Sequence, residues 1–249
     1  MLPASVKKGA EDFRKGRVVL IYDADDREGE TDLAMPAFSV SWKDIAFFRK
    51  RGGGLICVAI HPLAAEKLGL PFVSDVMRCA SEKFPSLRGL VEEEGDIPYD
   101  RRSSFSLWVN HRETFTGITD RDRALTINRI GRAVERVLAG LPYDFCDEFR
   151  TPGHVAILRA ADGLLEERCG QTELSVALAL LAGIPPAVAI CEMLDEETGR
   201  ALPKEKARSF AEANNIAFIQ GEEIKIAFEK MYPSYAYLYT FLNENVHSI

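Results

Sequence analysis

The stretch VVLIYDADDREGETD, residues 18–32, decides the fold. It begins with the run Val18–Tyr22, whose side chains are apolar or aromatic and predict a buried strand. Six carboxylates and one arginine then crowd into residues 23–32. Like charges held this close at a strand end are unfavourable unless a cation shares the space. We therefore expect a divalent metal, a phosphorylated polyol held by Arg27, or both at this loop.

Outward from this stretch, apolar strand-like runs alternate with amphipathic helical segments. Several strands are apolar throughout, which is typical of a sheet covered on both faces with some parallel pairs. We expect an α/β (α+β) fold: a single three-layer domain over residues 1–249, with helices on both faces of a mixed, largely buried sheet. The expected strands are 18–22, 55–60, 105–109, 155–160, 187–194 and 217–219, and the expected helices begin near residues 5, 41, 62, 120, 172, 203 and 222.

The segments outside these elements carry their own expectations. An N-terminal helix is predicted within residues 1–16, and Ser41 with Asp44 has the spacing of a capping box. Residues 80–103 are polar and predict a long loop that serves as a lid over a pocket. The aromatic tail 232–249 is expected to pack on the body or on a partner subunit.

The composition excludes several classes of function. The net charge is −7, and basic residues are interleaved with acidic ones, which argues against a nucleic-acid partner. No apolar run approaches the length of roughly 18 residues that a membrane span requires. Five scattered cysteines without CxxC spacing fit a reducing cytoplasm better than a disulfide framework.

Four further features have both a functional and a plain reading. In FRTPGH, residues 149–154, the Pro-Gly turn leads into a strand and places His154 at its entrance, where a histidine is more often structural than catalytic. In RCGQTE, residues 168–173, the helix start is either a phosphate cradle or an ordinary N-cap. Glu192 falls inside the expected apolar strand 187–194, so it is either a buried acid/base group or a residue at the exposed end of that strand. Cys57 reads most simply as a small buried hydrophobe.

Together these motifs resemble 3,4-dihydroxy-2-butanone 4-phosphate synthase of riboflavin biosynthesis, in its archaeal form. The resemblance covers residues from about 10 to 220, and its motifs stand in the family's order. They are YDADDREGETD (22–32), GGGLICVAIHP (52–62), FTGITDRDRA (115–124), FRTPGHVAILRA (149–160), RCGQTE (168–173) and ICEM (190–193).

The resemblance implies a lyase that converts ribulose 5-phosphate to formate and 3,4-dihydroxy-2-butanone 4-phosphate. It implies Mg²⁺ as the cofactor, with Mn²⁺ as an alternative to it. It also implies a homodimer with pockets near the subunit boundary. Glu28 would be a metal ligand that also faces the substrate, and His154 and Glu192 the acid/base pair. The remaining implied site residues are Arg27, Asp32, Arg168, Cys169, Gly170, Gln171, Thr172 and Glu192 for binding substrate, with Asp23, Glu30, Cys57 and Glu173 completing the pocket.

One position departs from the family pattern. The family's cradle reads GHTE and its histidine is a metal ligand, whereas this chain has Gln171 there. An amide oxygen suits Mg²⁺, which prefers hard oxygen ligands. The chain is therefore either a working synthase with a weaker or more selective metal site, or a relative with an altered reaction. A sugar-phosphate binding protein and a sugar-phosphate isomerase or aldolase are the competing functions, and formate release distinguishes them.

Overall fold

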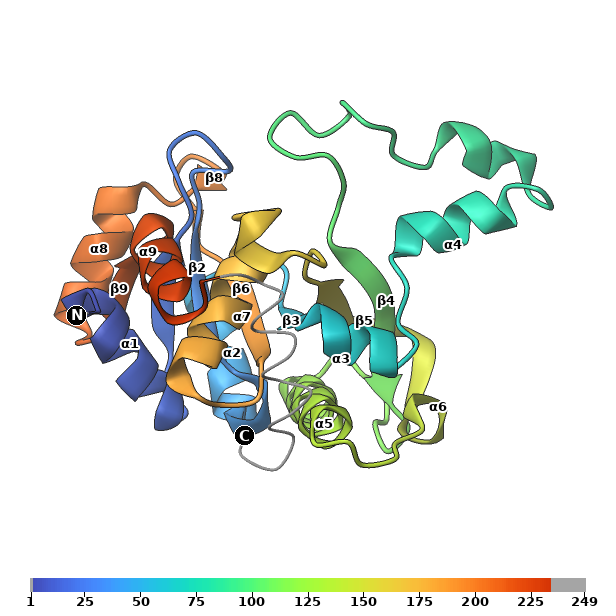
Figure 1. The fold of residues 1–249 in the computed structure, drawn as a ribbon, viewed down its shortest axis with the longest axis horizontal. Coiled ribbons are helices and arrows are strands. Elements are labelled where there is room, and N and C mark those ends of the chain that lie inside the picture. Colours follow the sequence, from blue (N-terminus) through green and yellow to red (C-terminus); the bar gives the residue numbers. More distant parts are fainter. Residues whose placement is uncertain (1, 234–249) are drawn as a thin grey trace.

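The fold is built on one mixed seven-stranded sheet (Figure 1). A computed structural model describes residues 2–233, and the tail expected over 232–249 lies almost entirely outside the described residues. The strands run in the order β4-β5-β3-β6-β2-β1-β9. Their bounds are β1 Val19–Tyr22, β2 Thr31–Pro36, β3 Cys57–Ile60, β4 Phe105–His111, β5 Phe149–Arg159, β6 Ala187–Glu192 and β9 Ala217–Gln220.

The sheet is mixed, as predicted. The pairs β1–β9 and β3–β5 are parallel. The pairs β1–β2, β2–β6, β3–β6 and β4–β5 are antiparallel. Strands β1, β2 and β3 are buried along their whole length, which agrees with a sheet covered on both faces.

Helices form the two outer layers. On one face α7 (Gln171–Ala182) packs between α1 (Ala4–Arg14) and α9 (Gly221–Met231) and contacts β1, β3 and β6. On the other face α5 (Asp120–Leu138) packs against α2 (Trp42–Arg51), and Phe47 of α2 meets Phe210 of α8 (Lys204–Ala213) with ring centroids 6.4 Å apart. The predicted three-layer arrangement is confirmed.

Local sequence signals explain where several helices begin. The capping box predicted at Ser41 and Asp44 starts α2. Thr119 caps α5 by accepting a hydrogen bond from the backbone N–H of Asp122 at 3.1 Å. Every residue of α7 is buried, so this helix forms the centre of its layer and fixes the position of its N-terminus relative to the sheet.

Two expectations about strands were incomplete. Residues 31–36 form β2, which was not predicted, because a carboxylate at Asp32 and a proline at Pro36 hide the strand pattern. The expected strand 155–160 begins earlier, at Phe149, so the Pro-Gly pair lies inside β5 and not before it. The ladder with β4 steps from Val109 opposite Val155 to Asn110 opposite Arg150, which leaves residues 151–154 as a bulge.

Short elements fill the connections. Pro62–Lys67 forms α3, and α4 (Val73–Ala80) and the 3₁₀ turn η2 (Pro85–Gly89) form an unpredicted arm that projects from the body (Figure 1). The rest of residues 80–103 is irregular, as expected. The remaining short elements are η1 (Ala37–Ser39), α6 (Phe145–Glu148), η3 (Leu164–Glu166), β7 (Leu194–Asp195) and β8 (Arg200–Ala201).

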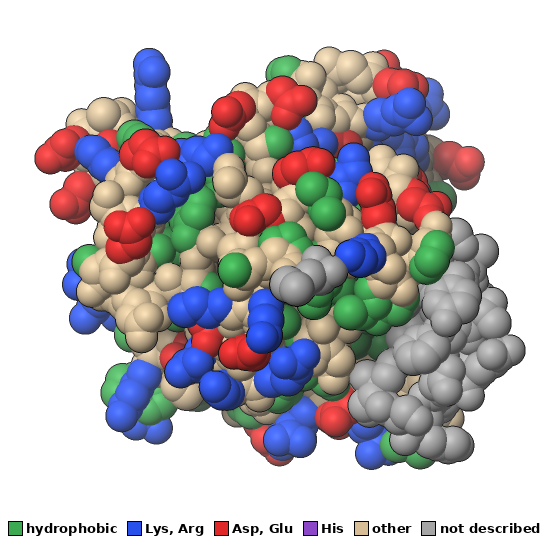
Figure 2. Space-filling model, turned by 60° about the vertical axis from the view of Figure 1, so that its left-hand side comes forward, with side chains coloured by type: hydrophobic (Ala, Val, Ile, Leu, Met, Phe, Trp, Pro, Cys, Tyr) green, Lys and Arg blue, Asp and Glu red, His purple; other side chains and the backbone are tan. Residues whose placement is uncertain are grey.

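The described surface carries both charges. Lys and Arg side chains are interspersed with Asp and Glu over the face seen in Figure 2. None of the helices within residues 2–233 is long and apolar enough to cross a membrane.

Candidate active site

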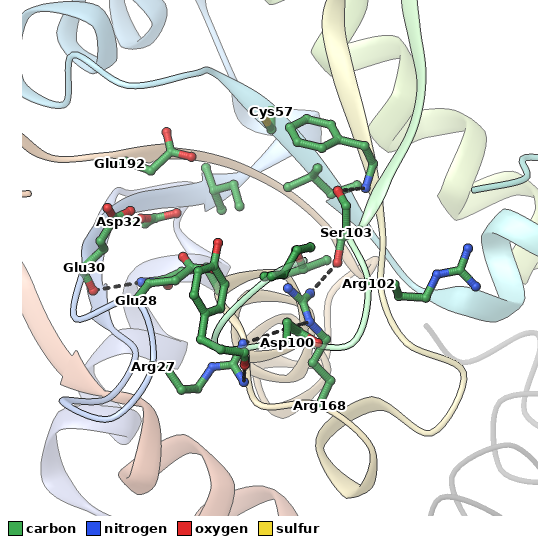
Figure 3. Close-up of a pocket in the computed structure, with 18 residues that line it drawn as sticks. Arg27, Glu28, Glu30, Asp32, Cys57, Asp100, Arg102, Ser103, Arg168 and Glu192 are labelled. Atoms are coloured by element: carbon green, nitrogen blue, oxygen red, sulfur yellow. Dashed lines mark hydrogen bonds and ion pairs between the residues drawn. The ribbon is translucent and has the colours of Figure 1, made fainter. Parts of the chain in front are cut away.

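A cleft of about 350 Å³ opens where the acidic loop, the end of β6 and the start of α7 meet (Figure 3). The segment 97–105, which leads from the arm into β4, closes its far side. Sequence segments far apart in the chain therefore converge on one space. The predicted site residues that line it are Arg27, Glu28, Glu30, Asp32, Cys57, Arg168, Gln171, Thr172 and Glu192.

Asp23 shapes the acidic loop from behind. Its carboxylate accepts hydrogen bonds from the backbone N–H groups of Glu28 and Glu30, both at 3.0 Å. The side chain is buried and does not line the cleft. Asp23 thus holds the β1–β2 connection in the form that turns Glu28 and Glu30 toward the cleft.

Four carboxylates share one side of the cleft: Glu28, Glu30, Asp32 and Glu192 (Figure 3). Asp32 and Glu192 are direct partners across the β2–β6 pairing. Burial, followed by the charge of Glu192, raises the pKa of Asp32 well above its usual range. Burial and the charge of Glu28 raise the pKa of Glu30 to about 7. The cleft therefore concentrates more negative charge than it can hold without protons or a cation.

Glu192 is held at a defined point by the glycine turn before β3. Its Oε2 accepts a hydrogen bond from the backbone N–H of Leu55 at 2.8 Å. A side chain at Gly54 would collide with this carboxylate, so the close approach requires glycine. Burial raises the pKa of Glu192, opposed by its backbone hydrogen bonds, and a raised pKa favours a role as a general acid or base.

Gln171 presents an oxygen without a partner. Its Nε2 donates to the carbonyl oxygens of Ile21 at 3.1 Å and Glu30 at 3.0 Å. Because only the amide nitrogen can donate, these two bonds fix the orientation of the group. Oε1 is consequently left buried with no hydrogen-bond partner, as is Oδ1 of Asp32.

These oxygens fit a hard divalent cation. Within residues 2–233 no cluster of three or more His, Cys, Asp or Glu side chains is arranged to enclose a metal ion alone. Mg²⁺ commonly uses one or two protein oxygens and completes its shell with water and substrate. Glu28 and the free amide oxygen of Gln171 offer that kind of site, beside carboxylates whose repulsion a cation would relieve.

Two arginines occupy the other end of the cleft. Arg168 pairs with Glu173, Nη1 to Oε2 at 3.1 Å, and Glu173 also accepts the backbone N–H of Ala161 at 2.9 Å. Arg27 pairs with Asp100, Nη2 to Oδ2 at 3.0 Å. Together with Thr172 in the first turn of α7, their N–H groups form an end of the cleft that is rich in hydrogen-bond donors and suited to an anion.

His154 lies apart from the cleft. It is exposed on the β5 bulge and does not line the cavity. Asn110 Oδ1 accepts the backbone N–H of His154 at 2.8 Å, and Asn110 Nδ2 lies 3.1 Å from the ring Nδ1. With that amide orientation Nδ1 accepts, so Nε2 carries the proton of the neutral ring and faces outward.

The other predicted site residues support the cleft from its walls. Burial raises the pKa of Cys57 well above its usual range, followed by the charge of Glu192, so the thiol stays protonated. Cys169 lines neighbouring cavities and its thiol lies 3.4 Å from the carbonyl oxygen of Leu165. Gly170 is the N-cap of α7, beneath the two arginines.

Sequence reasoning missed the contribution of residues 97–105. Tyr99, Asp100 and Ser104 line the cleft, and the last two contact Arg168. This segment holds one aspartate, two arginines and two serines, and it carries no local signal for such a role. Asn110 was missed as well, because only the bulge in β5 brings it beside His154.

The acidic cluster predicts an unusual pH dependence of stability. With EDTA present, the free energy of unfolding should fall by about 1–2 kcal/mol between roughly pH 5 and pH 8, with solvent screening of the half-buried Glu30 allowed for. A raised pKa in the folded state favours folding fully below the unfolded pKa, and this advantage is lost as the pH rises through the folded value, about 7 for Glu30. Urea unfolding at both pH values measures this.

Two variants and added Mg²⁺ test whether carboxylate repulsion causes this fall in stability. Asp32→Asn removes the fully buried acid and should flatten the fall, whereas exposed Glu66→Gln should not. Added Mg²⁺ should restore the stability lost at the higher pH. Equal stability of the wild type at both pH values in EDTA would show that the carboxylates do not repel one another as described.

Comparisons with known proteins show the family of this chain. The family model for 3,4-dihydroxy-2-butanone 4-phosphate synthase matches residues 7–227. The synthase of Archaeoglobus fulgidus is 66% identical over 218 residues, covering 88% of this chain and 91% of that protein. The synthase of Methanosarcina acetivorans is 54% identical over 224 residues, covering 90% and 91%. A crystal structure of a synthase in complex with two magnesium ions has a TM-score of 0.70 at 28% identity, covering 90% of this chain and 96% of that one. The chain belongs to the 3,4-dihydroxy-2-butanone 4-phosphate synthase family.

Proposed function

We propose that this protein is a lyase of riboflavin biosynthesis that converts D-ribulose 5-phosphate to formate and L-3,4-dihydroxy-2-butanone 4-phosphate. The observation that carries the proposal is the meeting of the acidic loop, Glu192 and the 168–172 turn in one cleft. Carboxylates at one end and arginines at the other match a substrate with a polyhydroxylated chain and a terminal phosphate.

The position of each residue in the cleft determines its role in the proposed reaction. Arg27, Arg168 and Thr172 take the phosphate and orient the sugar chain toward the carboxylates. The backbone N–H of Leu55 holds Glu192 in place, and the pKa of Glu192 is raised. Glu192 removes the proton from the substrate carbon next to the carbonyl group. Glu30 and Asp32 have raised pKa values too, so they can return protons during dehydration and formate loss.

Mg²⁺ is the cofactor that the oxygen ligands favour, with Mn²⁺ as an alternative to it. Glu28 and Gln171 would hold it, the latter through its free Oε1. When bound, the ion stabilises negative charge that develops on adjacent substrate oxygens. Since Gln171 cannot titrate, proton transfer falls to the neighbouring carboxylates.

His154 serves the reaction in a homodimer. Its side chain is exposed and lies beside Asn110 of β4, and the large side chains of Trp108 on β4 and of Phe115 and Ile118 after it are exposed as well. Phe115 is 92% exposed, which is costly for an aromatic side chain without a covering partner. Docking of a second copy on this surface would cover these rings and deliver His154 to the partner's cleft.

Product analysis tests the proposed reaction. Incubation with ¹³C-labelled ribulose 5-phosphate and Mg²⁺, followed by carbon NMR, should give equal amounts of formate and the four-carbon phosphate. An isomerase or an aldolase would give other sugars, and a binding protein would leave the substrate unchanged. Any of these three results would reject the lyase.

Location in a reducing cytoplasm stays a prediction that rests on the five free cysteines.

Exchange of Gln171 for histidine tests the metal site. Gln171→His supplies an imidazole nitrogen, so Mn²⁺ and Co²⁺ should bind at least about tenfold more tightly, while turnover with Mg²⁺ persists. Calorimetric titration of both proteins with each metal measures this, with Gln220→His, at the N-cap of α9, as the control. Unchanged affinities would show that residue 171 is not a ligand.

A further inference from the structure

The two arginines of the cleft share a carboxylate that the chain itself supplies. Arg27 Nη2 donates to Oδ2 of Asp100 at 3.0 Å, and Arg168 Nε donates to the same oxygen (Figure 3). The Asp100 side chain is only 10% exposed. Two guanidinium groups that meet on one oxygen hold it as they would hold an oxygen of a phosphate.

The surroundings of this oxygen are those of an anion subsite. A Cβ placed on Gly170 would lie 3.1 Å from Cζ of Arg168 and 3.2 Å from Nη2 of Arg27, so both guanidinium groups sit over the first turn of α7. Nε of Arg27 is buried there without a hydrogen-bond partner. This end of the cleft is thus only partly satisfied by the protein's own groups.

The two carboxylates that neutralise Arg168 differ in origin. Glu173 belongs to the all-buried helix α7, is itself fully buried, and ties Arg168 to the backbone of Ala161. Asp100 instead comes from the segment that connects the projecting arm to β4. Burial raises the pKa of Asp100, but hydrogen bonds and charge from Arg168 and Arg27 outweigh this and lower it, so the group is ionised at neutral pH.

We propose that Asp100 occupies the phosphate subsite of the empty enzyme as an internal competitor and leaves it when the substrate's phosphate binds. This inference rests on the proposed function. A phosphate dianion brings more charge and more acceptor oxygens to the two arginines than one carboxylate does, so it displaces Asp100. A sugar without a phosphate cannot displace it, and Asp100 thereby favours phosphorylated substrates.

Removal of the competitor should tighten anion binding. The apparent dissociation constant of a ligand is its intrinsic value divided by the fraction of free subsites. If Asp100 fills the subsite most of the time, Asp100→Asn should bind inorganic phosphate at least about tenfold more tightly than the wild type. The KM for ribulose 5-phosphate should fall, while kcat should not rise.

Calorimetric titration of the intact protein with inorganic phosphate is the test. Asp120→Asn is the matched control, since Asp120 also bridges two arginines, Arg49 at 3.0 Å and Arg123 at 3.1 Å, and all three residues lie outside the cleft. Its phosphate affinity should equal that of the wild type. Asp100→Ser is the second variant and tests the proposal if Asp100→Asn does not fold.

Each result decides the proposal. Tighter phosphate binding by Asp100→Asn or Asp100→Ser, and not by Asp120→Asn, supports the competitor. Unchanged or weaker binding in both Asp100 variants overturns it, because Asp100 would then help to hold the anion or lie apart from it. Phosphate titration needs no turnover, so a protein that releases no formate still shows whether Asp100 competes with the anion.

Discussion

Glu192→Gln is expected to lower kcat for ribulose 5-phosphate by about 10²–10⁴-fold, the usual contribution of a general acid/base. Glutamine keeps an oxygen for the backbone N–H of Leu55, so the side chain stays in place while the exchangeable proton is lost. The folded state should be at least as stable as the wild type, because burial already disfavours the charged form of Glu192. Formate release and thermal unfolding measure the two effects.

The control for this substitution is Glu196→Gln, an exposed glutamate four residues further along the chain. It should leave kcat unchanged. If Glu192→Gln retained kcat within a factor of about three while the protein stayed folded, Glu192 would not be the proton-transfer group. The raised pKa of Glu30 and Asp32 would then direct the search to those two residues.

His154→Ala is expected to lower kcat by at least about 10²-fold, and a heterodimer should restore part of the loss. In the proposed homodimer each cleft uses Glu192 of its own subunit and His154 of the other. A heterodimer of His154→Ala with Glu192→Gln subunits then contains one complete site out of two. Purified through two different affinity tags, it should show about half the wild-type kcat per dimer.

The control pairs His154→Ala with a subunit that carries both substitutions. That heterodimer contains no complete site and should be inactive. Absence of recovery in the first heterodimer, with assembly verified by mass, would mean that His154 does not act in the partner's cleft. Recovery in both would mean that His154 is dispensable.

Much of the fold followed from local patterns. The apolar strands expected over 18–22 and 55–60, the capping box at Ser41 and the amphipathic α5 depend on nearby residues, and each was found close to its expected place. Strand β2 was missed because its burial depends on Asp32 lying opposite Glu192, far along the chain. The projecting arm with α4 was missed although Val73, Val76, Met77 and Ala80 recur at helical spacing, because the helix is only 8 residues long.

The site was predictable to the extent that its residues stand in dense motifs. Nine predicted residues line one cleft, since the acidic loop and the 168–172 turn each concentrate charge that needs a partner. The place of His154 could not be read from its motif, because the β5 bulge moves it away from the strand entrance. The role of Asp100 in the cleft could not be predicted from the sequence, because it depends on ion pairs with two arginines from other segments.

In the proposed metal site, the fixed amide of Gln171 has a consequence for which metal ion the protein binds in a cell. An imidazole at this position would attract zinc or copper, which outcompete lighter ions wherever nitrogen is offered. The amide oxygen removes that attraction, and its Nε2 is tied to the carbonyls of Ile21 and Glu30, so it cannot rotate to present anything else. We therefore expect Mg²⁺, which is abundant in cells, to bind this site without a metallochaperone. We expect zinc and copper to inhibit the protein little.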